Sequence, residues 1–207
     1  MASDGPGEAM PRVAEPWQQG GSLAGMATHS IRVIGDPVLK ERAAPVVDID
    51  SKLVRLVDDM FDTMYEAPGL GLAAPQIGVR KRLFVYDHDD EPGVLINPVI
   101  AESDGEWLYN EGCLSVPGLY FEIVRPRRVV ITGLDLNGND VSLEVDDLVG
   151  RLFQHELDHL DGVLLVEHLS EEQRKGAKRE LRELMLHGPN RNADDKLIDL
   201  DGGLRLP

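Results

Sequence analysis

Residues 148–162 read LVGRLFQHELDHLDG, a stretch whose apolar residues recur at the spacing of an amphipathic helix that ends at Gly162. Within it, His155, Glu156 and His159 form the pattern HExxH. Residues four apart lie on one face of a helix, so both imidazoles can reach one metal ion, with Glu156 beside its open coordination position. A divalent ion lowers the pKa of its bound water toward ~7, and a neighbouring carboxylate can then transfer protons. The pattern predicts metal-dependent hydrolysis; the alternative is a solvated helix face.

A catalytic metal site needs a third protein ligand, and the sequence offers three choices. The longer pattern HExxHxxGxxH fails, because Leu165 stands where its last His should be. Glu180 and Glu183 lie among Lys and Arg residues, which favours an exposed, ion-paired helix face. Cys113 is the only cysteine, so it forms no internal disulfide, and its thiolate would be a strong ligand for Fe(II) or Zn(II). A small buried hydrophobe is the alternative for an isolated Cys.

The regions around this stretch predict strands followed by helices. Residues 50–66 carry one apolar stripe after an Asp that can cap a helix, and a last helix at 170–187 opens with Ser170 and Gln173 in the spacing of a capping box. Between residues 81 and 146, short apolar runs broken by Asp, Gly and Pro predict strands, which read KRLFVYD, GVLINPVI, EWLY, RRVVITGLDL and DVSLEV. Asn137-Gly138 suits a tight turn between the last two runs. This order predicts an α+β fold with antiparallel sheets.

Both ends of the chain differ from its body. Residues 1–28 and 188–207 are rich in small and polar residues and show no sustained apolar periodicity, so we expect a disordered N-terminal tail and a flexible C-terminal tail. Residues 29–187 remain for the catalytic domain. A chain of 207 residues fits one domain with tails.

The composition disfavours several classes of function. Hydrophobic residues make up 42% of the chain and charged residues 28%, which is a globular composition. The 21 Lys and Arg residues against 37 Asp and Glu residues give a formal net charge of −16, so binding to DNA, RNA or anionic lipid over the whole surface is disfavoured. No stretch approaches the ~20 apolar residues of a membrane helix, and the first residues lack a signal peptide. We therefore expect a cytoplasmic protein.

Three separated motifs occur in order along the chain: GLGLAAPQ at 69–76, EGCLS at 111–115 and QHELDH at 154–159. Together they resemble the three signatures of bacterial-type peptide deformylases, and the resemblance covers about residues 30–187. It implies antiparallel β-sheets packed around a central HExxH-bearing helix, with a C-terminal helix. It also implies a metal-dependent amidohydrolase that removes the N-formyl group from the N-terminal formylmethionine of newly synthesised proteins and releases formate.

The same resemblance implies the metal ligands and the proton carrier. Cys113, His155 and His159 would bind one metal ion, and Glu156 would act as general acid and base. The resemblance implies Fe(II) as the working ion, with Zn, Ni or Co able to occupy the same site. The thiolate and imidazole donors suit this group of metals.

Further residues of the motifs would contact the substrate. The side-chain amide of Gln76 and the backbone N–H of Leu114 would hold the formyl oxygen as it becomes an oxyanion. Preorganised donors of this kind commonly contribute about 3 kcal/mol each, and Gln donates without titrating. The backbone near Leu70, Gly71 and Gly112 would lie against an extended substrate, strand beside strand.

The implied partners are nascent formylated polypeptides. Helix 170–187 carries five Arg or Lys residues against four Glu residues, so a weak ribosome contact through this helix stands beside the simpler reading of a solvated face. The segment GLYFEIVRP at 118–126 looks longer than the loop of the shorter family members. This difference leaves open whether Arg125 or Arg127 contacts the substrate.

Two other classes of function compete with this interpretation. An HExxH metallopeptidase is disfavoured, because the third His is missing and the Cys motif is present. A non-catalytic metal-binding or interaction module descended from an enzyme is the other alternative. Loss of Glu156, Gln76 or a ligand would indicate such a module, and all of them are retained.

Overall fold

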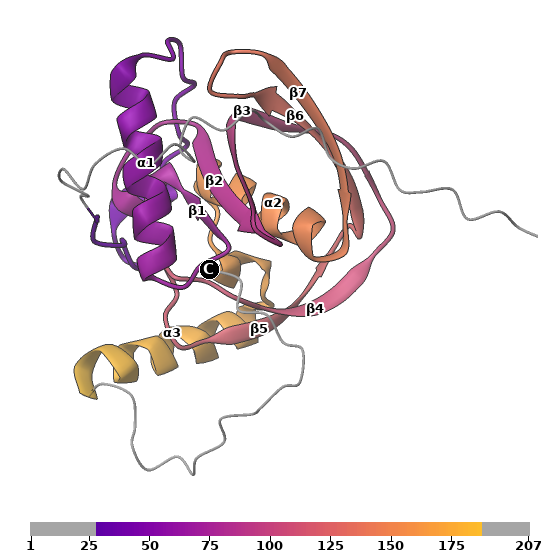
Figure 1. Ribbon diagram of the computed structural model, residues 1–207. Coiled ribbons are helices and arrows are strands. Elements are labelled where there is room, and N and C mark those ends of the chain that lie inside the picture. Colours follow the sequence, from indigo (N-terminus) through magenta and orange to yellow (C-terminus); the bar gives the residue numbers. More distant parts are fainter. Residues whose placement is uncertain (1–27, 188–207) are drawn as a thin grey trace, which may run out of the picture.

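The computed structural model describes residues 28–187 of the chain (Figure 1). Its helices are α1 (Ser51–Glu66), α2 (Asp147–Leu160) and α3 (Glu171–His187), with the short 3-10 helices η1 (Pro37–Lys40), η2 (Ala74–Ile77) and η3 (Leu165–His168). Its strands are β1 (Gly71–Ala73), β2 (Leu83–His88), β3 (Glu91–Asp104), β4 (Trp107–Gly112), β5 (Tyr120–Arg125), β6 (Arg128–Leu134) and β7 (Asp140–Asp146). The predicted tails at 1–28 and 188–207 lie outside the described residues, apart from residue 28.

These strands form two antiparallel sheets. Five strands pair in the order β1-β2-β3-β6-β7, and β4 pairs with β5 in a separate two-stranded sheet. The helix α2 packs against β1, β2, β6 and β7 of the larger sheet. From its other side, Arg151 of α2 donates hydrogen bonds to backbone carbonyls of Trp107 in β4 and Ile123 in β5. The helix that contains residues 155–159 therefore lies between the two sheets (Figure 1). The predicted α+β class with antiparallel sheets is confirmed.

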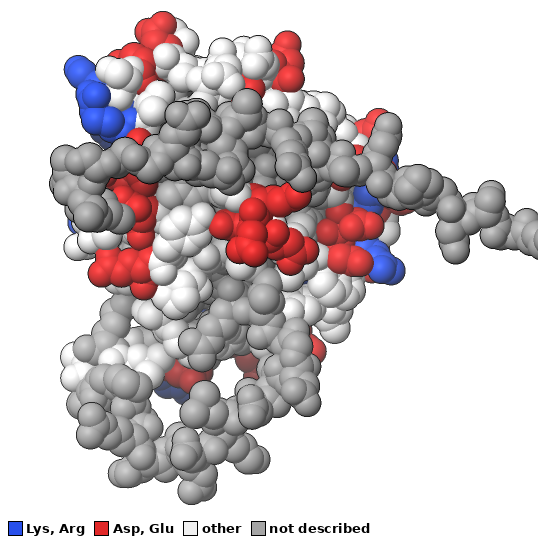
Figure 2. Space-filling model, in the orientation of Figure 1, with Lys and Arg blue, Asp and Glu red and all other residues white. Residues whose placement is uncertain are grey.

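The first helix begins where the sequence predicts. The side chain of Asp50 accepts hydrogen bonds from the backbone N–H groups of Lys52 and Leu53, at 3.0 and 2.9 Å, and so satisfies two amides of the first turn. Its apolar stripe is buried against β1 and β2, in a cluster that includes Leu53, Val57, Met60 and Met64. Its other face is acidic. Figure 2 shows Asp and Glu side chains outnumbering Lys and Arg on the face of the molecule that carries α1.

Two of the strands, β1 and β5, are not predicted from the sequence. The strand β1 has only three residues, and its Gly71 pairs with Tyr86 of β2. The strand β5 occupies most of the segment 118–126, which looks like a loop in the sequence, and it pairs with β4 along its whole length. Charged residues interrupt the apolar pattern of β5, but one of them, Arg125, is buried with acidic partners. Its burial depends on residues far away in the sequence, so local patterning misses the strand.

The connection between β6 and β7 is longer than a two-residue turn. Of the pair Asn137-Gly138, only Gly138 has a positive φ, of 79°. The carboxylate of Asp135 accepts hydrogen bonds from the backbone N–H groups of Asn137 and Asn139, at 2.8 and 2.9 Å. This Asx turn organises a loop over residues 135–139 in place of the expected tight turn.

The last helix has the predicted capping box. The backbone N–H of Ser170 donates to Oε1 of Gln173 at 3.0 Å, and the backbone N–H of Gln173 donates to Oγ of Ser170 at 3.3 Å. Ala177 and Leu181 bury one side of α3 in an apolar cluster that also contains Cys113. None of the helices within residues 28–187 is long and apolar enough to cross a membrane.

Candidate metal centre and active site

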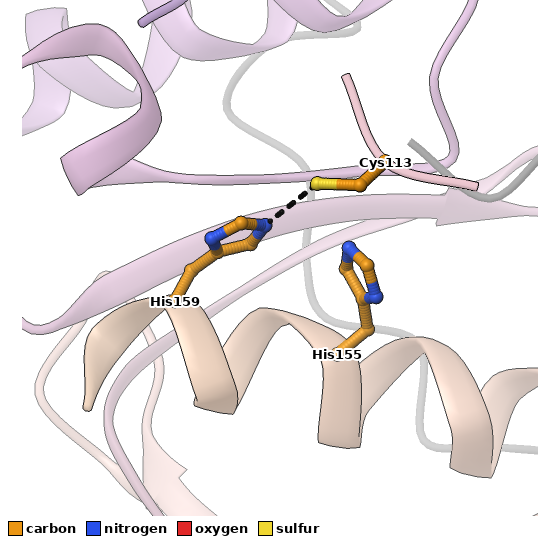
Figure 3. Close-up of side chains that lie close together, drawn as sticks. All are labelled: Cys113, His155 and His159. Carbon is orange, nitrogen blue, oxygen red and sulfur yellow. Dashed lines mark hydrogen bonds between the residues drawn. The ribbon is translucent and has the colours of Figure 1, made fainter. Parts of the chain in front are cut away.

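Three predicted metal ligands converge in the structure. Cys113, His155 and His159 are all buried, and each offers one ligand atom within 4.8 Å of the others. Figure 3 shows both imidazoles rising from one face of α2 toward the Cys113 sulfur, which lies 3.2 Å from Nε2 of His159. The i and i+4 spacing puts the two rings side by side. Cys113 follows the end of β4 and starts a turn that its carbonyl closes by accepting the N–H of Val116 at 2.9 Å.

The donor chemistry of this cluster fits a divalent metal ion. Nε2 of His155 is buried and has no hydrogen-bond partner among the described residues. Burial opposes ionisation of the Cys113 thiol, but the neighbouring imidazoles of His159 and His155 outweigh it and lower the pKa of the thiol to about 5. A buried thiolate beside two imidazoles is a donor set that suits Fe(II) and Zn(II).

A buried carboxylate orients one of these imidazoles. Oε2 of Glu111 lies 3.2 Å from Nδ1 of His155, so the ring presents Nε2 to the metal site when Nδ1 is protonated. Arg125 and Arg151 also donate to Glu111, and Arg125 does so with two nitrogens, at 2.7 and 3.1 Å. Burial alone would raise the pKa of Glu111, but the hydrogen bonds from His155 and Arg125 hold it well below its usual range. Glu111 therefore stays a carboxylate.

The predicted proton carrier lies beside this cluster. Glu156 is fully buried, and neither of its carboxylate oxygens is hydrogen-bonded within the part of the chain described. Burial raises the pKa of Glu156 to about 7, against the opposing effect of His155 and His159. The carboxylate also lies close to β1, because a Cβ atom added at Gly71 would be 2.8 Å from its Oε1. A carboxylate with a pKa near neutrality and free lone pairs suits proton transfer.

The predicted oxyanion donors are fixed by neighbouring groups. Gln76 is fully buried in η2, and its Oε1 accepts the backbone N–H of Ala73 at 2.8 Å. This bond leaves the amide nitrogen of Gln76 as the donor, and it lies 3.4 Å from Oγ of Ser115. Leu114 stands between Cys113 and Ser115 and packs against the cluster that α1 buries. The second motif therefore places its Ser115 side chain beside the glutamine of the first motif.

The predicted substrate-contacting residues lie at strand ends. Gly71 opens β1, an edge strand of the larger sheet, and Leu70 precedes it and is partly buried. Gly112 ends β4 directly before Cys113. The ring of Tyr120 lies over Gly112, since an added Cβ atom would be 2.5 Å from its Cε1. Both glycines therefore have close neighbours within the protein itself.

The two arginines considered as substrate contacts have protein partners. Arg125 is 5% exposed and donates to Glu111 and, at 2.8 Å, to Asp158. Arg127 pairs at the surface with Asp147, at 2.6 Å. The sequence predicted no role for Glu111 or Asp158, although the motifs at 111–115 and 154–159 contain them. Both are acidic residues without a predicted role in motifs whose neighbouring residues were assigned to the site. That combination is the signal that could have found them.

The alternative third ligands are not part of the cluster. Glu180 and Glu183 lie on exposed positions of α3. Among residues 28–187, Cys113, His155 and His159 form the group that can bind one ion.

Comparisons with known proteins agree with this geometry. The family model described as polypeptide deformylase matches residues 28–175. A peptide deformylase of Acidothermus cellulolyticus is 51% identical over 158 residues, which are 76% of this chain and 88% of that protein. One of Parafrankia is 48% identical over 160 residues, covering 76% and 87%.

Solved structures give the same result. A crystal structure of a peptide deformylase from Legionella pneumophila superposes with a TM-score of 0.74 at 43% identity, covering 79% of this chain and all of that one. A peptide deformylase from Ehrlichia chaffeensis in complex with actinonin superposes with a TM-score of 0.73 at 38% identity, covering 76% and 98%.

Proposed function

Because this chain belongs to the polypeptide deformylase family, whose members remove the N-formyl group from nascent peptides, we propose which of its residues carry out that reaction. Cys113, His155 and His159 bind the metal ion on which the family depends, and Glu156 transfers protons beside it. The convergence of a thiolate and two imidazoles next to a buried, unpaired carboxylate supports this assignment most strongly.

The proposed metal is Fe(II), one ion per chain, with Zn, Ni or Co as substitutes. Held by these three residues, the ion would act as a Lewis acid and would lower the pKa of a water molecule toward ~7. Metal analysis of protein purified without oxygen tests this identity.

The protein groups then have separate tasks. Glu156 takes the proton of the attacking water and gives it to the departing amine nitrogen, so that the C–N bond of the formamide breaks to formate and a free amino terminus. The Gln76 amide and the Leu114 N–H donate to the formyl oxygen while it carries negative charge. Ala73 supports this role, because its N–H holds the Gln76 side chain with the amide nitrogen as the remaining donor.

The proposed substrate contacts lie at the start of β1 and the end of β4. An extended peptide pairs with the backbone near Leu70 and Gly71 on one side and Gly112 on the other, as an added strand.

We assign the catalytic domain to residues 29–187. A cytoplasmic location and a weak ribosome contact through 170–187 also belong to this proposal.

Formate release tests the function. The full chain, freed of metal and reloaded, is incubated with formyl-Met-Ala-Ser and, as a control, acetyl-Met-Ala-Ser. We expect formate from the first peptide only, and only with metal. Cleavage of an internal peptide bond without formate release would instead favour a metallopeptidase.

A further inference from the structure

A histidine outside the three motifs is joined to the metal ligands by an unbroken series of polar contacts. We propose that His168 is a positioning residue: it holds Asp158 against Arg125, and Arg125 in turn holds the carboxylate of Glu111 that orients His155. This inference rests on the proposed metal ligands and adds a residue to the site that the motifs do not contain.

The distances along this series are those of hydrogen bonds. Nε2 of His168 lies 2.7 Å from Oδ2 of Asp158, and the same oxygen accepts Nη1–H of Arg125 at 2.8 Å. Arg125 then donates to both oxygens of Glu111, at 2.7 and 3.1 Å, and Glu111 reaches Nδ1 of His155 at 3.2 Å. The series crosses from η3 to α2, β5 and β4 and returns to α2.

Burial increases from the outer end of the series to the inner end. The side chains of His168 and Asp158 are 31% and 25% exposed, whereas Arg125 is 5% exposed and Glu111 is fully buried. Water can therefore compete at the outer end only. A buried guanidinium needs all of its partners in place, because an unsatisfied charged group is costly away from water.

The element that carries His168 is itself held in place. Leu165 and Val166 of η3 are buried. From α3, Arg174 donates to the backbone carbonyls of Glu167 and Leu169, at 2.8 and 3.2 Å, on both sides of His168. The imidazole therefore meets Asp158 from a fixed backbone, which is the condition for orienting another group.

Removal of the His168 imidazole should weaken the hold on Glu111 and His155 while the three metal ligands stay in place. Without the His168 donor, the partly exposed Asp158 carboxylate can turn toward water. Nη1 of Arg125 then loses the hydrogen bond that it donates to Asp158. The two bonds from Arg125 to Glu111 remain. Loss of a group that is hydrogen-bonded to a metal ligand typically lowers metal affinity about 10–100-fold. His168 is further from the ligand, so we expect a smaller effect, in which the metal dissociates about 3- to 10-fold faster.

The test uses the full chain loaded with Co(II), whose visible spectrum reports the ligand field. We compare the rate of metal loss to a chelator and the absorption spectrum in His168→Ala, His168→Gln and wild type. His88→Ala is the matched control, because His88 is 30% exposed and pairs with Asp89 at 3.4 Å but lies on β2. We expect faster loss and a shifted spectrum in His168→Ala, recovery in His168→Gln, whose amide can donate to Asp158, and wild-type behaviour in His88→Ala.

Two results would overturn the positioning role. One is a His168→Ala protein with the wild-type rate and spectrum. The other is equal impairment of the Ala and Gln variants, which would show that the donor is irrelevant. Cys113→Ala tests the ligand set separately, because it should abolish the sulfur-to-cobalt charge-transfer absorption. If wild type lacks that absorption, the ligand assignment itself fails; if it is present and His168 is inert, only the positioning role fails.

Discussion

The Glu156 carboxylate and the backbone of Gly71 approach so closely that no side chain fits between them. A Cβ atom at residue 71 would lie 2.8 Å from Oε1 of Glu156 and 2.8 Å from Cδ1 of Leu152. The absence of a side chain at residue 71 therefore allows Glu156, the proposed proton carrier, to occupy its place.

Substitution Gly71→Ala should lower turnover while metal binding persists. The added methyl group forces Glu156 or Leu152 to move, and overpacking of this kind costs about 1–3 kcal/mol. Formate assay and metal analysis measure the two effects. Gly176→Ala is the control, because an added Cβ atom there meets nothing within 4 Å and should leave turnover unchanged. Normal turnover in Gly71→Ala would contradict the close approach.

Substitution Glu156→Ala should separate catalysis from metal binding. General acid and base catalysis typically contributes 10²- to 10⁴-fold, so turnover should fall by about that factor while metal content stays at one ion per chain. Hydroxamate chelators should still bind the loaded variant but not the metal-free protein. Glu180→Ala, which removes an exposed carboxylate of α3, should change neither quantity. A Glu156→Ala enzyme with near-normal turnover would overturn the proposed mechanism.

Substitution Cys113→Ser should remove metal and activity together. It replaces a thiolate, which the two imidazoles stabilise, by a neutral hydroxyl that is a poor ligand for these metals. Metal analysis and formate assay on the same purified sample test this expectation. Full metal content in the variant would show that the sulfur is not a ligand.

Substitution Glu111→Gln should weaken both the metal site and the fold. The amide cannot balance Arg125 and Arg151, and breaking a buried ion pair by removing one partner costs about 3–5 kcal/mol. Metal affinity should fall about 10–100-fold, because His155 loses its orienting carboxylate. Chelator competition and thermal unfolding of the metal-free protein measure these changes. Glu144→Gln, at an exposed pair with Arg128, should alter neither.

A ribosome contact through α3 should depend on three exposed cations. Arg174 caps η3 and Lys175 pairs with Glu171 at 2.6 Å, whereas Lys178, Arg179 and Arg182 point to the exposed side of the helix. Reversal of these three charges should abolish pelleting with ribosomes at low salt, because such binding rests on phosphate contacts. Formate release from a tripeptide should not change.

The control for this experiment reverses Lys52 and Arg55, two exposed cations on α1. Equal pelleting of the α3 variant and wild type would remove the ribosome contact from the proposal.

Local spacing was sufficient to determine much of this protein from its sequence. The stripe and Asp50 cap of α1, the capping box of α3 and the helix around His155 and His159 depend on residues within a few positions of each other. The three motifs identified the family for the same reason, since each is a short contiguous pattern.

Only the tertiary structure decided how the site is supported. Cys113 meets His159 across 46 positions, and Arg125 meets Glu111 across 14 and Asp158 across 33. The sequence of β5 resembles a loop, and its strand structure is explained only by its pairing with β4 and the burial of Arg125. The need for glycine at residue 71 is explained only by the fold, in which α2 brings Glu156 against β1. Periodicity reports which face of an element is apolar, whereas the burial of a charge depends on partners that the fold brings from distant segments.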